Sequence, residues 1–321
     1  MTDSPWGRFW FSSGSALNLA ALRVLVAAHA LWILLSRDPA ASSGLPVEFW
    51  RFVQDTARWR FLIFEGHPLL ERLLQTTAIA ALASALVGLW PRASCLAAGA
   101  LLYHLAPLET ILYTPSPWVK GYTITTLALV VLGASRCGDA LALRREGPGA
   151  PAWEYRWPLV VIQVALVQVY LFAGYAKMLR TGPSWVLDTV RGYTQLYTQN
   201  EEVAVFHALG TWLVAHPALC VAAGCVAVAL NLTFWTVLFW RGARRVLVPF
   251  ALLWHAAILF TMNIAFLEAP LLLVFVDWDG LRARFLARRA PAASCSGRGS
   301  FGNSSWIHES SSSKPSGCQA R

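Results

Sequence analysis

Long apolar segments, each close to the length that crosses a lipid bilayer, constrain this chain more than any other feature. Hydrophobic residues make up 56% of the 321 residues and charged residues only 13%, whereas soluble domains carry about 25% charged residues. A helix of about 20 apolar residues spans the hydrocarbon core, and it satisfies its backbone polar groups within the segment. The sequence therefore predicts an all-α, polytopic integral membrane helical bundle.

Seven apolar segments are predicted to form the spans. They are residues 16–35, 69–90, 93–113, 121–134, 157–179, 217–240 and 246–276. The last segment is longer than a single span needs, and Asn263, Glu268 and Pro270 interrupt it. It forms either one long broken helix or two short segments, so we expect seven or eight crossings.

Other stretches are predicted to lie beside or outside the membrane. Residues 48–61 mix aromatic and charged side chains, which is typical of an interfacial helix. Residues 203–214 are apolar but too short to span, which favours a re-entrant or interfacial piece. The domain division that follows is a transmembrane domain over residues 1–280 and a tail over residues 281–321. The tail is first basic and then rich in Ser and Gly, and its last part, residues 291–321, is expected to be disordered.

The net charge of +9 points to the membrane rather than to nucleic acid. Arginines cluster between apolar segments, as the positive-inside rule describes, and no basic stripe carries stacking aromatics. We therefore expect membrane lipids and no nucleic acid as partners. The N-terminus and the basic loops after the second, fourth and sixth spans are placed in the cytoplasm, with the protein integral to the cell (inner) membrane. The six cysteines show no C-x-x-C spacing, so no metal site is predicted.

Lys177 stands near the end of the fifth apolar segment and is the leading candidate for a functional residue. A lysine at membrane depth costs about 2.5 to about 10 kcal/mol unless it finds a partner, a wet cavity or the interface. Gln163 and Tyr170 precede it at seven-residue intervals and share its helix face with Gly174. This stripe predicts a buried site that ends in an amine. The alternative is a lysine that snorkels to the interface beside Arg180.

Other polar residues in the apolar segments have structural interpretations. Arg23 is expected to form a buried ion pair with Glu109 or Glu268, because a guanidinium stays charged and is a poor base. His29 and His104 are interpreted as hydrogen-bonded core residues. For His255 the structural and functional readings are both kept open.

Five segments, taken in order, resemble the HTTM (horizontally transferred transmembrane) family, whose membrane domain is shared with vitamin K-dependent γ-glutamyl carboxylase. They are Leu22-Arg23, Gly66-His67-Pro68-Leu69, residues 137–141, residues 169–178 with Trp185, and His255 with Met262-Asn263. The segment that contains Lys177 is the most specific of them.

The resemblance implies an enzyme related to the vitamin K-dependent carboxylase, a lyase or ligase type of activity with a reduced, vitamin K-like quinone as its cofactor. In that carboxylase a lysine of the matching segment is the base that deprotonates reduced vitamin K, and Lys177 holds that position. The resemblance therefore implies Lys177 and His255 as catalytic residues. Gln163, Tyr170 and Gly174 are then expected to bind the quinone.

The chain also departs from the carboxylase pattern. Residues 119–122 carry no histidine, where the carboxylase has one, and Asn231 stands where the family often has an acidic residue. Residues 281–321 hold no counterpart of the large extramembrane region that binds the protein substrate of the carboxylase. The alternative function is a membrane transporter, or a ligand-binding or structural membrane subunit, because such proteins also place charges inside the membrane.

Overall fold

Helices account for all the regular structure that the computed structural model describes. The described residues are 4–36, 38–46, 48, 67–113, 122–145, 151–198, 206–262 and 264–289, and no strand occurs within these ranges. Apart from residue 48, the interfacial helix predicted over residues 48–61 falls outside them, as does the tail predicted over residues 291–321. The chain divides into two units, Met1–Leu281 and Arg282–Arg321, and the fold below is that of the first.

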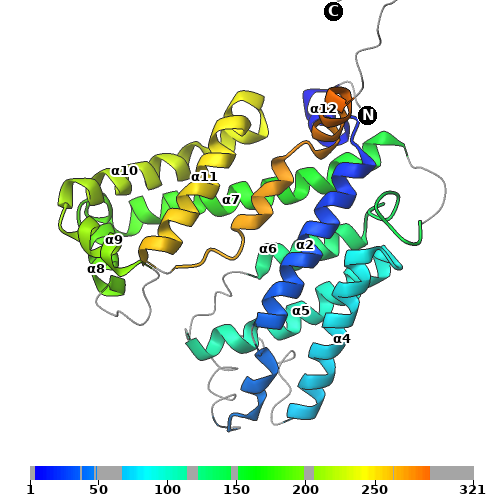
Figure 1. Cartoon of the computed structure of the whole chain (residues 1–321), viewed down its shortest axis with the longest axis horizontal. Coiled ribbons are helices and arrows are strands. Elements are labelled where there is room, and N and C mark those ends of the chain that lie inside the picture. The colour runs from blue at the N-terminus through cyan, green and yellow to red at the C-terminus, as the bar shows by residue number, and fades with distance from the viewer. Residues whose placement is uncertain are drawn as a thin grey trace, which may run out of the picture. The chain divides into compact units, whose positions relative to one another are not determined.

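The first group of helices comes from the N-terminal half of the chain. It contains α1 (Pro5–Phe11), α2 (Ala16–Ser36), α4 (Pro68–Val87), α5 (Pro91–Tyr113) and α6 (Thr123–Gly133). Helix α4 packs against α2 and α5, and α5 packs against α6 (Figure 1). Proline begins both α4 and α5, and Gly88 ends α4 in the left-handed conformation with φ of 75°. Gly88 and Pro91 therefore produce the tight turn that sets α4 beside α5.

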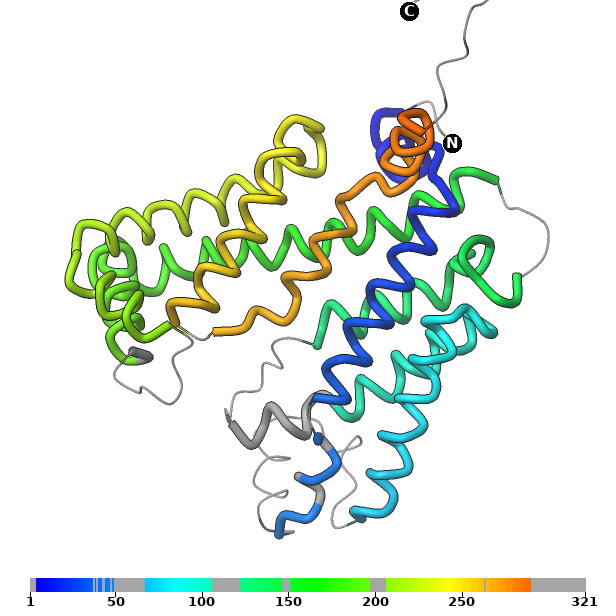
Figure 2. The backbone as a smooth tube through the Cα atoms, in the orientation of Figure 1, coloured from blue at the N-terminus to red at the C-terminus, as the bar shows by residue number. Residues whose placement is uncertain are grey.

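The second group is arranged around α7, which is the longest helix of the described part (Figure 2). Its elements are the 3-10 turn η3 (Ala152–Tyr155), α7 (Arg156–Arg180), the π-helical turn η4 (Trp185–Thr189), α8 (Val190–Thr198), α9 (His207–Val214), α10 (Pro217–Thr233), the 3-10 helix η5 (Phe234–Leu238), α11 (Arg241–Met262), the 3-10 helix η6 (Ala269–Phe275) and α12 (Trp278–Arg289). Helix α7 packs along α10, and η6 returns between α2 and α7, which joins the two groups.

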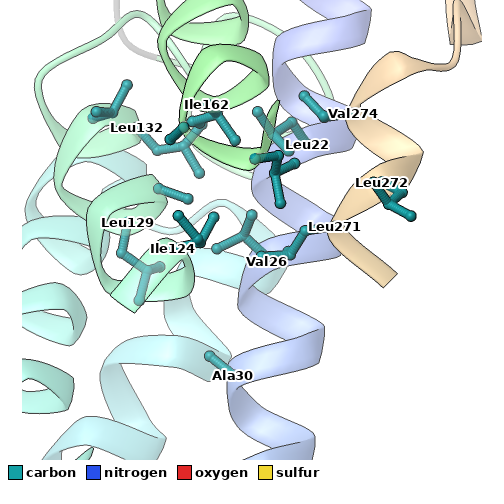
Figure 3. Close-up of a cluster of buried hydrophobic side chains, with 14 of the residues drawn as sticks. Leu22, Val26, Ala30, Ile124, Leu129, Leu132, Ile162, Leu271, Leu272 and Val274 are labelled. Atoms are coloured by element: carbon teal, nitrogen blue, oxygen red, sulfur yellow. The ribbon is translucent and has the colours of Figure 1, made fainter. Parts of the chain in front are cut away.

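Apolar side chains from both groups fill a common core. Figure 3 shows buried residues of α2, α6, α7 and η6 pointing toward one another, among them Leu22, Val26, Leu129, Ile162 and Leu271. Each of these side chains is at most 1% exposed. The contact of η6 with α2 makes the last apolar segment part of the core.

Five helices of the described part are long and apolar enough to cross a membrane, so the chain is a multi-pass integral membrane protein. They are Ala16–Ser36, Pro68–Val87, Ala152–Arg180, Pro217–Leu238 and Arg241–Met262. The seven or eight crossings predicted from the sequence are not shown by these helices. Helix α6 has only 11 residues, and the last apolar segment changes from α11 to the seven-residue η6.

Candidate functional site

Lys177 lies in the last turn of α7 and is half-buried. Its ammonium nitrogen Nζ stands 4.7 Å from the centre of the Trp185 ring, which is a cation–π contact. Gly182, with φ of 61°, turns the chain between the two residues. Among the described residues, none of the ion pairs involves Lys177. The fold therefore brings together the lysine and the tryptophan that the sequence singled out, and leaves the amine without a carboxylate in the described part.

Tyr170 and His255 form a hydrogen bond between α7 and α11. The Tyr170 hydroxyl lies 2.6 Å from His255 Nε2, and it donates when that nitrogen carries no proton. The Tyr170 ring stacks on Phe234, with the ring centres 4.0 Å apart and the planes 20° from parallel. Each partner stands fourteen residues after the first residue of its helix, at about 21 Å along the axis. The pair therefore lies inside two of the candidate membrane spans, away from the helix ends.

The second ring nitrogen of His255, Nδ1, is buried and has no hydrogen-bond partner among the described residues. The ring packs against Phe266, with centres 4.5 Å apart. Lys177 follows Tyr170 by seven residues on α7, so it lies two turns further along the same face of the helix. We call Lys177, Tyr170 and His255 the amine cluster. It combines an amine with a phenol–imidazole pair, and such a set is able to accept and relay protons.

Gln163 and Gly174, the other two residues of the predicted stripe, contact protein groups. Gln163 Nε2 donates a hydrogen bond of 3.2 Å to the carbonyl oxygen of Val274 in η6. A Cβ added to Gly174 would lie 2.9 Å from Cβ of Asn231 and 3.0 Å from Cδ2 of Leu232, so α10 fills this face. The predicted roles of Gln163 and Gly174 in quinone binding stay predictions, and the observed contacts explain both residues through helix packing.

Arg23 is fully buried in α2, yet its described hydrogen-bond partners are backbone carbonyls. Nη1 donates to the oxygen of Cys137 at 2.7 Å, and Nη2 donates to the oxygen of Leu141. In the same loop, Asp139 accepts a hydrogen bond of 2.7 Å from the hydroxyl of Tyr155. These contacts tie α2 to the loop after α6. The predicted ion pair of Arg23 with Glu109 or Glu268 stays a prediction, because the Glu109 side chain lies outside the described part.

His104 is buried and hydrogen-bonded, which confirms its interpretation as a core residue: its Nε2 lies 2.8 Å from Oε2 of Glu71. His29 is also buried, but its Nε2 has no hydrogen-bond partner among the described residues. Glu71 itself is fully buried and was missed in the sequence analysis. The two partners are 33 positions apart, so no local pattern connects them. The one available signal was a lone carboxylate within an apolar segment.

No group of three His, Cys, Asp or Glu side chains in the described part of the chain is placed to hold a metal ion. No family model matches this chain, and neither a curated protein nor a solved structure matches it.

Proposed function

We propose that this multi-pass membrane protein is a quinone-linked enzyme of the HTTM type, related to the vitamin K-dependent carboxylase, with Lys177 as its base. The amine cluster is the observation that carries the proposal. Lys177 has no carboxylate partner in the described part, and Tyr170, which is hydrogen-bonded to His255, lies two turns earlier on the same face of α7.

The residues around the cluster suit a reduced quinone, which is a flat apolar ring with two hydroxyl groups. The amine of Lys177 and Nδ1 of His255 are polar groups free to meet hydroxyls, since neither has a hydrogen-bond partner among the described residues. The rings of Phe234 and Phe266 provide apolar walls beside Tyr170 and His255. A reduced quinone requires a mainly apolar or aromatic pocket with a few polar groups that bind its hydroxyls. When bound, the quinol supplies an acidic hydroxyl and reducing electrons.

The chain's own residues have distinct roles in this proposal. Lys177 accepts a proton at Nζ, and the face of Trp185 stabilises the resulting ammonium through the cation–π contact. Tyr170 and His255 carry a proton between α7 and α11 along their 2.6 Å hydrogen bond. The stack of Tyr170 on Phe234 fixes the hydroxyl in position.

Retention of endogenous quinone tests the proposal. Wild type and Lys177→Ala are purified in mild detergent, and the lipids that copurify are identified by mass spectrometry. Arg180→Ala is the matched control, because it removes an exposed cation from the same last turn of α7. We expect quinone with the wild type and the control, and its loss in Lys177→Ala. Equal quinone in all three samples, or none in any, contradicts the assignment of Lys177.

A transporter or ligand-binding protein is the second candidate, and the break after α11 favours it. The chain leaves α11 at Met262, passes Glu268 and Pro270, and continues as the buried 3-10 helix η6. Interrupted helices inside a membrane line substrate pathways in many transporters. Flux of a solute into proteoliposomes that contain the protein, and none without it, supports this candidate in place of the enzyme. A structural subunit would instead be stable only when expressed with its partner.

A further inference from the structure

A cavity of about 340 Å³ lies at the end of the first unit where α7 and α11 begin. Three segments far apart in the sequence meet in it: the loop after α1, the first residue of α7, and the junction of η5 with α11. Its lining residues are Ser12, Ser13, Arg156, Leu238, Phe239, Arg241 and Arg244. We call it the arginine cavity. It is separate from the amine cluster, because Tyr170 and His255 each lie fourteen residues further along their helix and Lys177 lies further still along α7.

The three arginines of the cavity lack a carboxylate partner within the described part of the chain. Arg244 donates from Nε and Nη2 to the carbonyl oxygen of Val237, at 3.1 and 2.9 Å. Nε of Arg156 is buried and has no hydrogen-bond partner among the residues that the structure describes. Arg241 acts electrostatically on Arg156, and both act on Arg244. Like charges brought together at a partly buried site repel one another, so a bound anion would stabilise them.

Two of these arginines also oppose the dipole of their own helix. Arg156 is the first residue of α7, and Arg241 is the first residue of α11. A helix N-terminus carries partial positive charge and unpaired N–H groups, which favour an anion and disfavour a cation. Cations at this position are unfavourable for folding alone. At α7 the N–H of Arg156 already donates to the carbonyl oxygen of Trp153, so an anion there would meet the guanidinium groups rather than a free helix end.

Gly14 holds the loop that carries Ser12 and Ser13 close to η3 and to the start of α7. Gly14 donates from its backbone nitrogen to the carbonyl oxygen of Ala152 at 2.9 Å. A Cβ on Gly14 would lie 2.7 Å from the backbone nitrogen of Arg156, so only glycine allows this approach. Ser12 and Ser13 thereby line the same cavity as the three arginines, and a serine hydroxyl is able to donate a hydrogen bond to a phosphate oxygen.

Aromatic side chains surround the cavity and place it at the membrane interface. Phe9 of α1 stacks on Phe239, with ring centres 5.4 Å apart. Trp6 and Trp240 are more than two-thirds exposed in the absence of lipid. Tryptophan and other aromatic residues gather at the level of the lipid headgroups. The anions that are present at this level of a bilayer are the headgroups of anionic lipids, which carry acyl chains.

We propose that the arginine cavity binds the phosphate of an anionic phospholipid headgroup. A volume of about 340 Å³ accommodates a phosphate with its glycerol end, while the acyl chains remain in the bilayer. Basic pockets between helices on one side of a membrane protein are suited to such headgroups. The site recognises the negatively charged oxygens of a phosphate group, which free inorganic phosphate also carries.

Thermal unfolding in detergent with defined additives tests the site. Wild type is compared with the double variant Arg156→Gln, Arg241→Gln. The probes are dioleoyl phosphatidylglycerol, dioleoyl phosphatidylcholine and inorganic phosphate. We expect phosphatidylglycerol to raise the unfolding temperature of the wild type, and its apparent affinity to fall about tenfold or more in the variant. Phosphatidylcholine should have little effect on either protein.

Two control variants make the result decisive. Arg144→Gln with Arg145→Gln removes the same charge from a basic loop outside the cavity, and should retain the wild-type response. Arg156→Lys with Arg241→Lys keeps the charge and should recover part of the response. If the double variant at Arg144 and Arg145 lost the response to phosphatidylglycerol as fully as the double variant at Arg156 and Arg241, the lipid would be attracted by positive charge in general. That result would overturn the proposed site. Protection by inorganic phosphate as strong as that by phosphatidylglycerol would overturn the lipid assignment.

Discussion

Nη1 of Arg23 donates a hydrogen bond to the carbonyl oxygen of Cys137, 2.7 Å away, and so fastens the loop after α6 to the first membrane span. The same loop reaches the α4–α5 turn, where Gly88 meets Ala142 so closely that a Cβ would lie 2.5 Å from Ala142 Cα. Arg23 and Cys137 are 114 positions apart, and both belong to segments of the proposed HTTM resemblance. Two segments chosen from the sequence therefore contact each other in the fold.

Replacing Arg23 by leucine should destabilise the protein by about 2–5 kcal/mol, because the buried carbonyl oxygen of Cys137 and the partly buried one of Leu141 lose their donor. Arg144→Leu is the control, since that side chain lies on an exposed part of the same loop, over the Trp90 ring. Unfolding in detergent, followed by size-exclusion chromatography after heating, measures both. Similar behaviour of the two variants would mean that the buried guanidinium contributes little.

Gly174→Ala should destabilise the contact between α7 and α10 by about 1–3 kcal/mol, because the new methyl group meets Asn231 near its backbone. Gly192→Ala in α8 is the matched control. No atom lies within 4 Å of a Cβ at that position, so the helix there should gain up to about 1 kcal/mol. The same unfolding assay compares them. A neutral Gly174→Ala would show that this face is open, as a ligand slot requires.

Four of the spans were predictable from the sequence with bounds close to those observed. The segment predicted over residues 16–35 is α2 (Ala16–Ser36), and the one over residues 157–179 is α7 (Arg156–Arg180). Both are long, mostly apolar runs that hold only a few polar side chains, such as Arg23 in α2 and Gln163 in α7. Such runs determine a helix almost independently of their neighbours, because the backbone in lipid must satisfy its own hydrogen bonds.

The last apolar segment shows what hydropathy does not determine. Composition alone does not distinguish α11 followed by a short 3-10 helix from two spans, since η6 is apolar and buried against α2 and α7. The hydrogen-bond partners of a side chain are even harder to predict from the sequence. The carbonyl oxygens that bind Arg23 are present at every residue, so sequence does not indicate which ones a buried arginine will meet.

The candidate site was predictable in part. Tyr170, Lys177 and His255 were chosen from the sequence, and the structure joins Tyr170 to His255 directly. Helical periodicity placed Gln163 on the same face as Lys177, but its hydrogen bond to Val274 depends on where η6 returns. The spacing of residues predicts which of them share one face of a helix. Which segment packs on that face depends on the tertiary fold.

Tyr170→Phe should separate the chemical role of Tyr170 from its packing role. It removes the hydroxyl that bonds to His255 and keeps the ring that stacks on Phe234, so the loss of stability should be about 1 kcal/mol. Tyr170→Ala also removes the ring and should lose about 3–5 kcal/mol. If the pair belongs to the proposed quinone site, Tyr170→Phe retains its fold and loses copurified quinone. Unchanged quinone in this variant would limit the pair to a structural role.

The Glu71–His104 pair should behave as a strongly coupled buried unit. Each of the variants Glu71→Leu and His104→Leu leaves one buried polar partner behind and should lose about 3–5 kcal/mol. The double variant should lose much less than the sum, with a coupling of about 1–3 kcal/mol. The neighbouring pair of Arg72 and Asp38, which is about half exposed, offers a control cycle whose coupling should be far smaller. Additive losses at Glu71 and His104 in the same unfolding assay would show that each is stabilised by groups other than its partner.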